Sequence, residues 1–389
     1  MADMTVKTVS ILGATGSVGR AAADLVIGAP ERFQAEAIAA GSDAEALANL
    51  GRELKARFVA VADENRYRDL KNALSGYKCE IAAGAAAVKE AGQRQADIAV
   101  AAIVGLAGLE STLAACMTGK TVALANKEAL VSAGDVVKAA AAANGAQILP
   151  VDSEHSALFQ AYEPERASTV EKLTLTASGG PFWKWSQSQI ANATLEDALR
   201  HPTWDMGSKI TIDSATMMNK GLELIEAARL FPLSEDRIDV LIHPQSIIHG
   251  MVSYRDGSVM AQLGAPDMQT PIAVALAWPD RMQTPVQRLD LASIGQLTFD
   301  APDPERFPSI NLARQALRDG GDRPAVLNAA NEVAVAAFLE GRISFVAIVE
   351  TVMAALAAVP GMHANTVEQV VEVDRQARLA ALNHISSLI

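Results

Sequence analysis

The chain has 389 residues, half of them apolar and a fifth charged, which is the composition of a globular protein large enough for two or three domains. Its net charge of −12, without any block rich in Lys and Arg, excludes an electrostatic footprint for nucleic acid, so local groups must hold any anionic ligand. We expect neither a signal peptide nor a membrane span, because the N-terminus lacks a basic segment and the apolar runs are short. Cys79 and Cys116 lack metal-type spacing and are typical of buried thiols in a reducing compartment, so a cytoplasmic enzyme is expected.

A glycine-rich loop follows the first apolar run. Residues 9–12 are predicted to form a buried strand, GATGSVG follows at 13–19, and a predicted helix ends near Gly28. This order is the context of a dinucleotide fingerprint, whose glycines admit the pyrophosphate while the N–H groups near Ser17 and Val18 face its charge. A tight turn between strand and helix is the alternative, and we favour the cofactor site.

A second strand, predicted at 33–40, ends at Gly41-Ser42-Asp43, where the ribose of a nucleotide is normally bound. An acid at this place accepts from the ribose 2′-OH and favours NAD, whereas a basic residue favours the 2′-phosphate of NADP. Asp43 serves equally well as the N-cap of the helix that follows it. The choice of cofactor stays open on these residues.

Further strands are predicted at 57–62, 98–104 and 121–125, with helices between them. The alternation predicts a parallel sheet with helices on both faces, whose ligands bind at the carboxyl ends of the strands. Asn126-Lys127-Glu128 directly follows one strand and Asp152 follows the next, so both groups should open onto one crevice.

The apolar run at 148–151 ends at Asp152-Ser153-Glu154-His155. Residues two apart in an extended chain point the same way, so Asp152 and Glu154 are expected to face one point. Two such carboxylates repel each other unless a cation joins them, and hard oxygen ligands suit Mg²⁺ or Mn²⁺. A solvated strand end is the alternative.

Two loops of the second half combine small and polar residues. A strand predicted at 173–177 ends in Ser178-Gly179-Gly180, which could hold a phosphate or form a simple turn. HPTWDMG, at 201–207, places Trp204 between Pro and Gly. This tryptophan fits a core position and a mobile lid equally well.

The run TIDSATMMNKGLELIEAA is predicted to be one helix, capped by Asp213 or Ser214. At the helical repeat, Asn219, Lys220 and Glu223 form one polar stripe near its start. With Ser214 they could clasp an anion, and Glu223 would supply a third metal oxygen. A solvent-facing polar stripe is the alternative.

Other residues of the second half have structural explanations. Glu226 lies further along the same helix and is interpreted as structural. Gly221 within a helix costs about 1 kcal/mol relative to Ala, which indicates a closely packed neighbour or ligand. YRDGSVMAQLG is expected to be a strand, and Asn328, Asn331 and Glu332 are expected to cap or pack helices. Four of the six histidines, which fall between 155 and 249 among these motifs, suggest functional use: His155, His201, His243 and His249.

Nine motifs, in order along nearly the whole chain, resemble the 1-deoxy-D-xylulose 5-phosphate reductoisomerase family: GATGSVG, ALANKEALV, PVDSEHSALFQ, ASGGPF, HPTWDMG, DSATMMNKGLE, IHPQSIIH, GAPDMQTPIA and LNAANEVAVAAF. The resemblance implies a homodimer without membrane or nucleic-acid partners. It implies an α/β fold with a Rossmann-like NADPH-binding domain (1–150), a catalytic domain with a lid (151–277), a linker (278–309) and a helical domain (310–389).

The resemblance also implies the roles of individual residues. NADPH would contact Thr15, Gly16, Ser17, Val18, Gly41, Asn126, Glu128 and Gly207. One Mg²⁺ or Mn²⁺ would be held by Asp152, Glu154 and Glu223. The substrate, a phosphorylated ketose, would be bound through its phosphate by Ser178, Ser214, Asn219 and Lys220, and elsewhere by Ser153, Lys127 and His201. Trp204 and Met206 would belong to the lid.

One departure concerns the cofactor. Family members often carry Lys or Arg where Ser42-Asp43 stands here, so the 2′-phosphate contact must come from Ser42, from backbone N–H groups or from a basic residue elsewhere. The expected reaction converts 1-deoxy-D-xylulose 5-phosphate to 2-C-methyl-D-erythritol 4-phosphate. A simpler dehydrogenase would share the first half of the chain, and a non-catalytic NADP sensor would keep GATGSVG, but neither needs three acids and a phosphate clasp.

Overall fold

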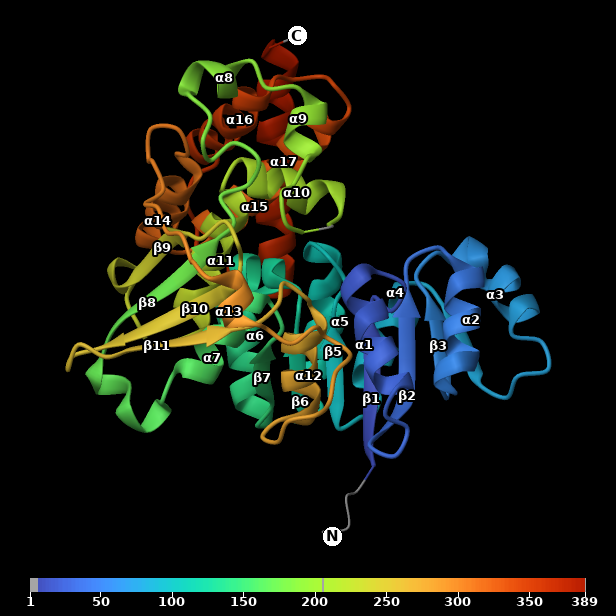
Figure 1. The fold of residues 1–389 in the computed structure, drawn as a ribbon. Coiled ribbons are helices and arrows are strands. Elements are labelled where there is room, and N and C mark those ends of the chain that lie inside the picture. Colours follow the sequence, from blue (N-terminus) through green and yellow to red (C-terminus); the bar gives the residue numbers. More distant parts are fainter. Residues whose placement is uncertain (1–5, 205, 389) are drawn as a thin grey trace. The chain divides into compact units, whose positions relative to one another are not determined.

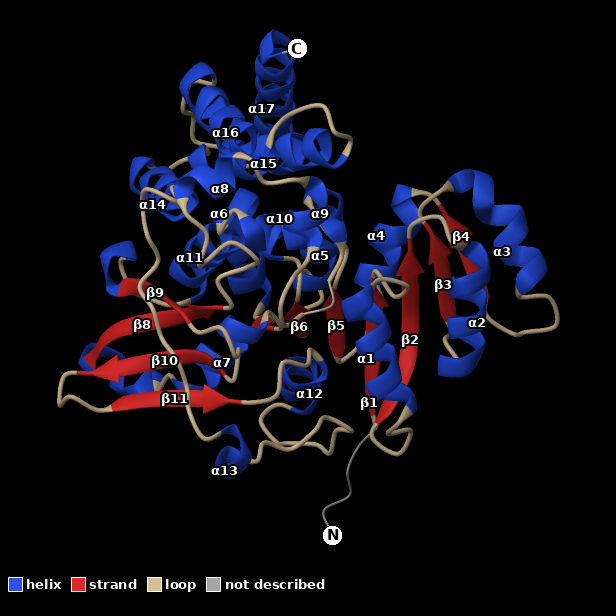
Figure 2. Cartoon of the chain, turned by 45° about the horizontal axis from the view of Figure 1, so that its top comes forward, coloured by secondary structure: helices blue, strands red, loops and turns tan. Residues whose placement is uncertain are grey.

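The computed structural model describes residues 6–204 and 206–388 (Figure 1). The chain divides into two compact units. The first comprises Met1–Ala129, Asp135–Ser156 and Asp267–Val286, and the second comprises Leu130–Gly134, Ala157–Pro266 and Gln287–Ile389. The predicted fold class is confirmed: the strands form a seven-stranded parallel sheet and a separate four-stranded sheet, and the C-terminal region is helical (Figure 2).

The seven-stranded sheet belongs to the first unit and has the order β4-β3-β2-β1-β5-β6-β7, with every neighbouring pair parallel. Its strands are β1 (Lys7–Leu12), β2 (Phe33–Ala40), β3 (Phe58–Val61), β4 (Glu80–Ala83), β5 (Ile98–Ala101), β6 (Thr121–Leu124) and β7 (Gln147–Pro150). All the strands predicted here are present within a few residues. The sequence did not predict β4, which lies at the edge of the sheet and is only partly buried.

Helices cover both faces of this sheet. On one face, α1 (Ser17–Ile27) packs beside α2 (Ala44–Leu54), with α3 (Tyr67–Ala73) against α2. The other face carries α4 (Ala85–Gln93) and α5 (Leu109–Cys116). The helix α12 (Gln269–Ala277) returns from much later in the chain to pack against α1, β6 and β7, and its residues from Pro271 to Ala277 are all buried. The long helix α6 (Lys127–Asn144) follows β6.

The four-stranded sheet of the second unit has the order β11-β10-β8-β9. Its strands are β8 (Val170–Ala177), β9 (Ile238–Ile242), β10 (Ile248–Tyr254) and β11 (Val259–Leu263), with β8 and β9 parallel and the other pairs antiparallel. The prediction of one strand over YRDGSVMAQLG is wrong. Tyr254 ends β10, and a turn with Gly257 at φ +87° leads into β11, as the Asp-Gly pair favours.

The helices of the second unit pack in two apolar clusters. One joins the sheet to Phe182, Phe307, Phe338 and Phe345, and the other lies among the C-terminal helices. The helices are α8 (Gln187–Ala191), α9 (Leu195–Leu199), α10 (Ser208–Ala215), α11 (Met218–Leu230), α14 (Ser309–Asp319), α15 (Arg323–Leu339), α16 (Phe345–Ala358) and α17 (Val367–Leu388). The boundary between the units falls within α7 (Ser153–Ala161).

The proline-rich segment predicted as a linker contains the one-turn helix α13 (Leu291–Ile294) and an antiparallel bridge from Asp300 to Ile242, and it is otherwise largely irregular. In the part of the chain that the structure describes, no helix combines the length and the apolar character that a membrane span requires. One helix, α11, contributes Leu224 to the cluster beside the sheet and Leu222 to the cluster among the C-terminal helices. The side chains of α11 are therefore held by packing on two sides.

Candidate active site

The glycine loop connects β1 to α1 as predicted. Gly13 adopts φ +88°, and Gly16 precedes the first residue of α1, where no side chain of the described residues caps the helix. The first-turn N–H groups of Ser17 and Val18 can therefore donate to an anion. A Cβ atom on Gly19 would lie 2.1 Å from the carbonyl oxygen of Gly13, so the helix can approach the loop only because this residue is glycine.

The position of this loop in the sheet suits a nucleotide. The sheet order changes direction at β1, whose neighbours are β2 and β5. Ligands of such sheets bind at this switch point, beyond the carboxyl ends of the strands. Thr15 lies in the loop that leaves β1, and Gly41 and Ser42 are exposed where β2 ends. The structure thus brings the first five cofactor candidates and Ser42 to the carboxyl ends of two adjacent strands.

Asp43 is the N-cap of α2, since its carboxylate accepts a hydrogen bond of 3.0 Å from the N–H of Ala46. The capping interpretation is confirmed, and it explains an acid at this place without any contact to a ribose.

We expect the substitution Asp43→Arg to raise the preference for NADPH over NADH, because it brings a positive charge to the place where the 2′-phosphate is normally bound. The loss of the cap should lower the free energy of unfolding by about 1 kcal/mol. The measurement is the ratio of kcat/KM for the two cofactors. Asp43→Asn is the matched control, because Asn caps as well as Asp but carries no charge. An unchanged ratio in Asp43→Arg would show that Asp43 is only a cap.

The carboxyl ends of β6 and β7 bring Lys127 and Asp152 together. The two side chains form an ion pair, and both are largely buried. Burial alone would raise the pKa of the Asp152 carboxyl, but the charges of Lys127 and His155 outweigh it and hold this pKa well below its usual range. The two strand ends therefore bring their polar groups together, with an ionised carboxylate beside an ammonium group.

The expected extended geometry of Asp152 and Glu154 is wrong. The strand β7 ends at Pro150, and α7 begins at Ser153, so Glu154 lies in the first turn of a helix. The N–H of Ser156 donates to the carbonyl oxygen of Asp152, and the Ser153 hydroxyl donates to the Glu154 carboxylate over 2.6 Å. Acids at a helix N-terminus are favoured by the helix dipole, which offsets part of their repulsion.

Asn126 and Glu128 flank Lys127 and are buried. The side chain of Asn126 caps α6 by accepting from the N–H of Ala129 over 3.2 Å, and it donates to the carbonyl oxygen of Gly105 over 3.1 Å. This amide thus ties the ends of β5 and β6 together. Its two hydrogen bonds hold the loops at the ends of these strands. The expected contact between Asn126 and the cofactor stays a prediction.

In the second unit, the loop after β8 lies against the end of α10. A Cβ atom on Gly180 would lie 2.6 Å from the carbonyl oxygen of Ser214, and Gly180 adopts φ +65°. Only glycine allows this approach, which brings the Ser178 loop beside Ser214. Two of the four phosphate candidates therefore come together although they are far apart in the sequence.

The prediction of a single helix capped by Asp213 or Ser214 is wrong. Both residues lie in the last turn of α10, and the chain then breaks at Met217, which has φ +59°, before α11 begins. Asp213 is buried, and its carboxylate accepts from Asn331 of α15 over 2.7 Å and pairs with Lys209 over 2.9 Å. Sequence reasoning missed this link, because Asp213 fitted a cap and Asn331 lies 118 residues away.

The polar stripe on α11 is present and is not exposed to solvent. The side chains of Asn219 and Lys220 both contact the carboxylate of Glu223. Lys220 is 4% and Glu223 1% exposed, so the alternative of a solvent-facing stripe is wrong. The stripe begins in the first turn of α11, whose N-terminus receives no cap from a side chain of the described residues.

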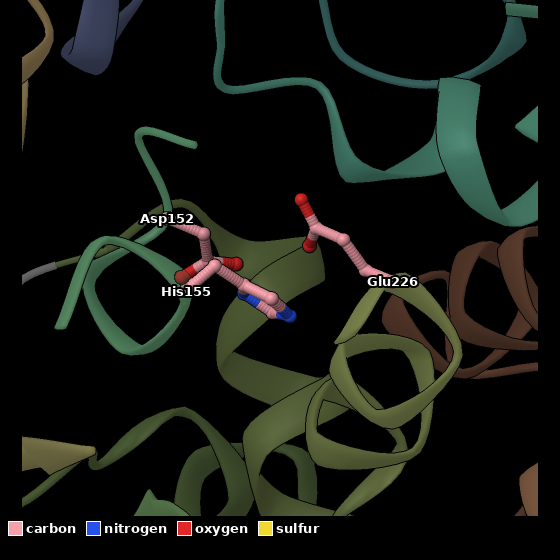
Figure 3. Close-up of side chains that lie close together, drawn as sticks. All are labelled: Asp152, His155 and Glu226. Atoms are coloured by element: carbon pink, nitrogen blue, oxygen red, sulfur yellow. The ribbon is translucent and has the colours of Figure 1, made fainter. Parts of the chain in front are cut away.

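The neighbours of the stripe are also defined. Gly221 packs against α14, where its Cβ would lie 3.0 Å from the Cβ of Ala313 and 3.1 Å from the carbonyl oxygen of Ser309. The predicted close neighbour is therefore a helix and not a ligand. Glu226, one turn further along α11, is 1% exposed. Figure 3 draws the side chains of Glu226, of Asp152, which precedes α7, and of His155, which lies within α7.

The loop 201–207 has neither helix nor strand in its described residues. Trp204 is only partly buried and lies edge-on to His249, with ring centroids 6.2 Å apart, so it is not a core tryptophan. Met206 is also partly buried, and Gly207 precedes α10 in the second unit. His243 is buried, bonds to Thr298 and accepts from the N–H of Ile247, which is a structural role.

Three family profiles match successive parts of the chain. The profile described as 1-deoxy-D-xylulose 5-phosphate reductoisomerase matches residues 9–134, its C-terminal domain matches 148–231, and the DXP reductoisomerase C-terminal domain matches 263–380. The 1-deoxy-D-xylulose 5-phosphate reductoisomerase of Rhodospirillum centenum is 54% identical over 382 residues, which cover 98% of this chain and 95% of the relative. That of Bradyrhizobium diazoefficiens is 57% identical over 355 residues, covering 91% and 87%.

Solved structures agree. The reductoisomerase from Zymomonas mobilis in complex with NADPH has a TM-score of 0.94 at 48% identity, covering 98% of this chain and all of that one. A reductoisomerase in complex with NADPH, fosmidomycin and magnesium has a TM-score of 0.94 at 41% identity, covering 98% and 99%. On this agreement in sequence and fold, the chain belongs to the 1-deoxy-D-xylulose 5-phosphate reductoisomerase family.

Proposed function

We infer that this chain converts 1-deoxy-D-xylulose 5-phosphate to 2-C-methyl-D-erythritol 4-phosphate, a step in the synthesis of isoprenoid precursors. The reaction is a metal-assisted rearrangement of the carbon skeleton followed by reduction with NADPH. The observation that carries this inference is identity of 54% to a reductoisomerase over 98% of the chain. Solved relatives are complexes with NADPH and with NADPH, fosmidomycin and magnesium.

NADPH supplies the hydride, and the glycine loop fits its pyrophosphate. The N–H groups at the start of α1 are available to an anion, and Gly13 and Gly19 leave no side chain in the turn. The residues that bind NADPH are Thr15, Gly16, Ser17, Val18, Gly41, Ser42, Asn126, Glu128 and Gly207. With Asp43 capping α2, the contact to the 2′-phosphate comes from Ser42, from nearby backbone N–H groups or from a basic residue elsewhere.

Asp152, Glu154 and Glu223 hold one Mg²⁺ or Mn²⁺. The donor set fits, because each residue offers a carboxylate oxygen and such hard ligands suit both ions. The low pKa of Asp152 keeps this carboxylate ionised and ready to bind a cation at neutral pH. When bound, the ion polarises the carbonyl of the ketose as a Lewis acid.

The substrate phosphate is bound by Ser178, Ser214, Asn219 and Lys220. Ser153 and His201 line the rest of the substrate site, and Lys127 orients a hydroxyl while stabilising negative charge that develops beside it. The phosphate is remote from the bonds that change, so its binding energy serves to align the reacting carbons and to order the lid with Trp204 and Met206. The closed lid excludes water.

These roles follow the chain in blocks. Residues 1–150 form the NADPH-binding domain, to which Gly207 is added from the next block. Residues 151–277 form the catalytic domain, to which Lys127 is added from the first. Residues 278–309 are a linker, and residues 310–389 brace the catalytic domain. The buried link from Asp213 to Asn331 supports the bracing role, since it joins α10 to the C-terminal helices. The enzyme works in the cytoplasm, which suits two free cysteines, and burial raises the pKa of the Cys116 thiol to about 11, so that this thiol is inert.

Two copies of the chain form a homodimer. The support is β11, which is the edge strand of its sheet and carries exposed apolar side chains, Val259 at 54% and Met260 at 49% exposure. These neighbours point to opposite faces of the strand. An edge with apolar side chains on both faces is a template for pairing with another chain.

We expect Met260→Asp to shift the protein from dimer to monomer, because it would place a charge in the apolar contact. The measurement is the molar mass by light scattering over a dilution series. Glu171→Lys is the control, because this exposed residue of the same sheet lies on β8, away from the edge. A monomeric wild type would refute the dimer. A Met260→Asp variant that stays dimeric would show that β11 does not form the interface.

The function is tested by the loss of NADPH absorbance on addition of 1-deoxy-D-xylulose 5-phosphate. EDTA should abolish turnover, and Mg²⁺ or Mn²⁺ added in excess should restore it, because the metal polarises the substrate. Turnover that persists in EDTA would show that the reaction does not need a metal ion. Absence of turnover with this substrate, alongside oxidation of a simple hydroxy acid, would indicate a plain dehydrogenase.

A further inference from the structure

The segment predicted as a linker contacts the chain that follows β8. Arg306 of this segment donates from Nη1 to the carbonyl oxygens of Trp183 and Trp185, over 3.0 and 2.8 Å. Its Nε donates to the carboxylate of Asp303 over 2.8 Å, and its guanidinium carbon lies 5.5 Å from the centre of the Phe307 ring. Phe307 belongs to the apolar cluster beside the four-stranded sheet. The guanidinium group is therefore fixed by its own segment while it bridges two backbone carbonyls of another.

The acid that orients this guanidinium group is itself fixed by the backbone. Oδ1 of Asp303 accepts from the N–H groups of Glu305 and Arg306 over 2.9 and 3.2 Å, and Oδ2 accepts from Nε of Arg306. The hydrogen bond from Arg306 lowers the pKa of the Asp303 carboxyl, so this group is ionised at neutral pH. The two side chains therefore form a charged, hydrogen-bonded pair with a defined geometry.

The backbone that Arg306 holds lies against Gly179, the second residue of the loop after β8. Gly179 adopts φ +85°, and a Cβ atom on it would lie 2.7 Å from the Cβ of Trp183 and 2.9 Å from Cγ2 of Ile242. Asp300 and Ile242 exchange two backbone hydrogen bonds, of 2.8 and 2.9 Å. The linker therefore holds both neighbours of Gly179, one through Arg306 and the other through Asp300.

The direction of the Ser178 hydroxyl depends on the same loop backbone. The N–H of Gly180 donates to the hydroxyl oxygen of Ser178 over 3.2 Å. Gly180 also packs against the carbonyl oxygen of Ser214, which would lie 2.6 Å from its Cβ position. The loop is thus in close contact with α10 as well as with the residues that the linker holds. A shift of this backbone would change the direction in which the Ser178 hydroxyl can donate.

We propose that Arg306 is a positioning residue, which holds the backbone beside Gly179 so that the Ser178 hydroxyl keeps the direction that binding of the substrate phosphate requires. The proposal rests on the assignment of Ser178 to the phosphate under the proposed function. It gives the segment predicted as a linker a part in substrate binding. Arg306 acts through its hydrogen bonds to two carbonyl oxygens and not through its charge.

Arg306→Lys separates the hydrogen bonds from the charge. Lysine keeps the positive charge but lacks the planar fork that reaches two carbonyl oxygens and the Asp303 carboxylate at once. We expect the inhibition constant of inorganic phosphate and KM for the ketose phosphate to rise ~10-fold, because a small misplacement of a binding group has effects of this order. Ser178→Ala, which removes the donor itself, should raise both constants by ~10- to 100-fold.

Arg314→Lys is the matched control for a purely structural role. The side chain of Arg314 is 18% exposed, against 25% for Arg306. It donates to the carbonyl oxygens of Glu235 and Ile238 over 2.7 and 2.6 Å and pairs with the Glu235 carboxylate. These carbonyl oxygens lie at the start of β9, whereas the loop after β8 packs against the last residue of that strand. Both variants should lower the denaturant midpoint of unfolding to a similar degree, but only Arg306→Lys should change the phosphate constants.

The deciding experiment combines Arg306→Lys with Ser178→Ala. If Arg306 acts through Ser178, the double variant should have the phosphate inhibition constant of Ser178→Ala alone, because the second change removes nothing further. Losses that multiply would show that Arg306 acts on the phosphate without Ser178 and would overturn the proposal. A wild-type constant in Arg306→Lys would overturn it as well, because the fork would then not be needed. So would equal rises in Arg306→Lys and Arg314→Lys, because any loosening of this unit would then have the same effect.

Asp303→Asn replaces Arg306→Lys if the latter does not fold. It leaves the two hydrogen bonds to the carbonyl oxygens but removes the acceptor for Nε of Arg306, so the phosphate inhibition constant should rise a few-fold. Glu235→Gln, which changes the acid beside Arg314 in the same way, should leave that constant unchanged. Equal constants in these two variants would overturn the proposal.

The affinity for NADPH, measured by fluorescence, should stay within a few-fold of the wild type in every variant and reports that each is folded. Failure of the proposed function is distinguishable, because the wild type itself would then not turn over the ketose phosphate. An active wild type whose phosphate constants do not change in Arg306→Lys refutes only the role of Arg306.

Discussion

Replacing Glu223 by Gln is expected to lower kcat at least ~100-fold while the affinity for NADPH stays within a few-fold. Gln has nearly the same shape, but it keeps only one acceptor oxygen, whereas Asn219 and Lys220 each donate to a different oxygen of the Glu223 carboxylate. The substitution therefore removes the negative charge and one of the two acceptors. A neutral amide oxygen is a weaker ligand for Mg²⁺ or Mn²⁺ than a carboxylate, so the cation should bind more weakly.

Three measurements isolate this effect. Steady-state turnover at rising Mn²⁺ should give a larger half-saturating concentration for Glu223→Gln than for the wild type. Paramagnetic resonance of free Mn²⁺ reports the same affinity without turnover. Fluorescence of bound NADPH should be unchanged, and a loss of this binding instead would place Glu223 in the cofactor site.

Glu226→Gln is the matched control, since both acids lie on α11 and both are 1% exposed. We interpret Glu226 as structural, so its amide variant should lose stability more than Mn²⁺ affinity. In the opposite pattern, Glu226→Gln would lose the cation and Glu223→Gln would keep it. This result would make Glu226, and not Glu223, the third metal ligand. The metal would then be held by the group that Figure 3 draws, Asp152, His155 and Glu226.

The parts of the fold that could be predicted are those with local signals. Apolar runs ending at glycine or a polar residue identified β1, β2, β3, β5, β6 and β7, because buried parallel strands are apolar throughout. The edge strand β4 offers only Ile81-Ala82-Ala83 before Gly84, a run too short to be recognised as a strand. The hairpin turn at Gly257 was overlooked because the apolar pattern resumes immediately after it.

In the candidate site, too, the features with a local sequence signal could be predicted and the others could not. The stripe of Asn219, Lys220 and Glu223 follows from helical spacing, and the structure buries it as one hydrogen-bonded group. The break at Met217 could not be predicted, because a left-handed φ at methionine has no sequence signal. The contact of Asp213 with Asn331 depends on packing between distant helices, which a single sequence does not reveal.

The pair Asp152 and Glu154 is instructive because its residues were correctly chosen for the wrong geometric reason. An alternating strand would turn Ser153 away from both acids, whereas the helical start of α7 lets the Ser153 hydroxyl donate to Glu154. A short apolar run followed by polar residues does not show whether a strand continues or a helix begins. The sequence therefore indicates the chemistry of the two acids but not the conformation of their backbone.

Gly19→Ala is expected to weaken NADPH binding by ~100-fold or more, because the shift it forces falls on the N–H groups that face the pyrophosphate. The added Cβ would lie 2.1 Å from the carbonyl oxygen of Gly13, and backbone cannot yield as a flexible side chain does. Gly13 is itself fixed at φ +88°, with its own Cβ position 2.6 Å from the carbonyl oxygen of Ala102. The start of α1 must therefore move, at a cost of about 1–3 kcal/mol in unfolding free energy.

Ala23→Gly, on the same helix, is the control that separates a general loss of stability from a distortion of the glycine loop. It should lower the free energy of unfolding by about 1 kcal/mol, because glycine is a poor helix former, but it leaves the contact between Gly13 and Gly19 unchanged. NADPH affinity from fluorescence should then fall in Gly19→Ala and persist in Ala23→Gly, while the Mn²⁺ affinity of both stays near that of the wild type. Equal NADPH affinities in the two variants would mean that the loop does not bind the pyrophosphate, since the steric clash acts there and nowhere else.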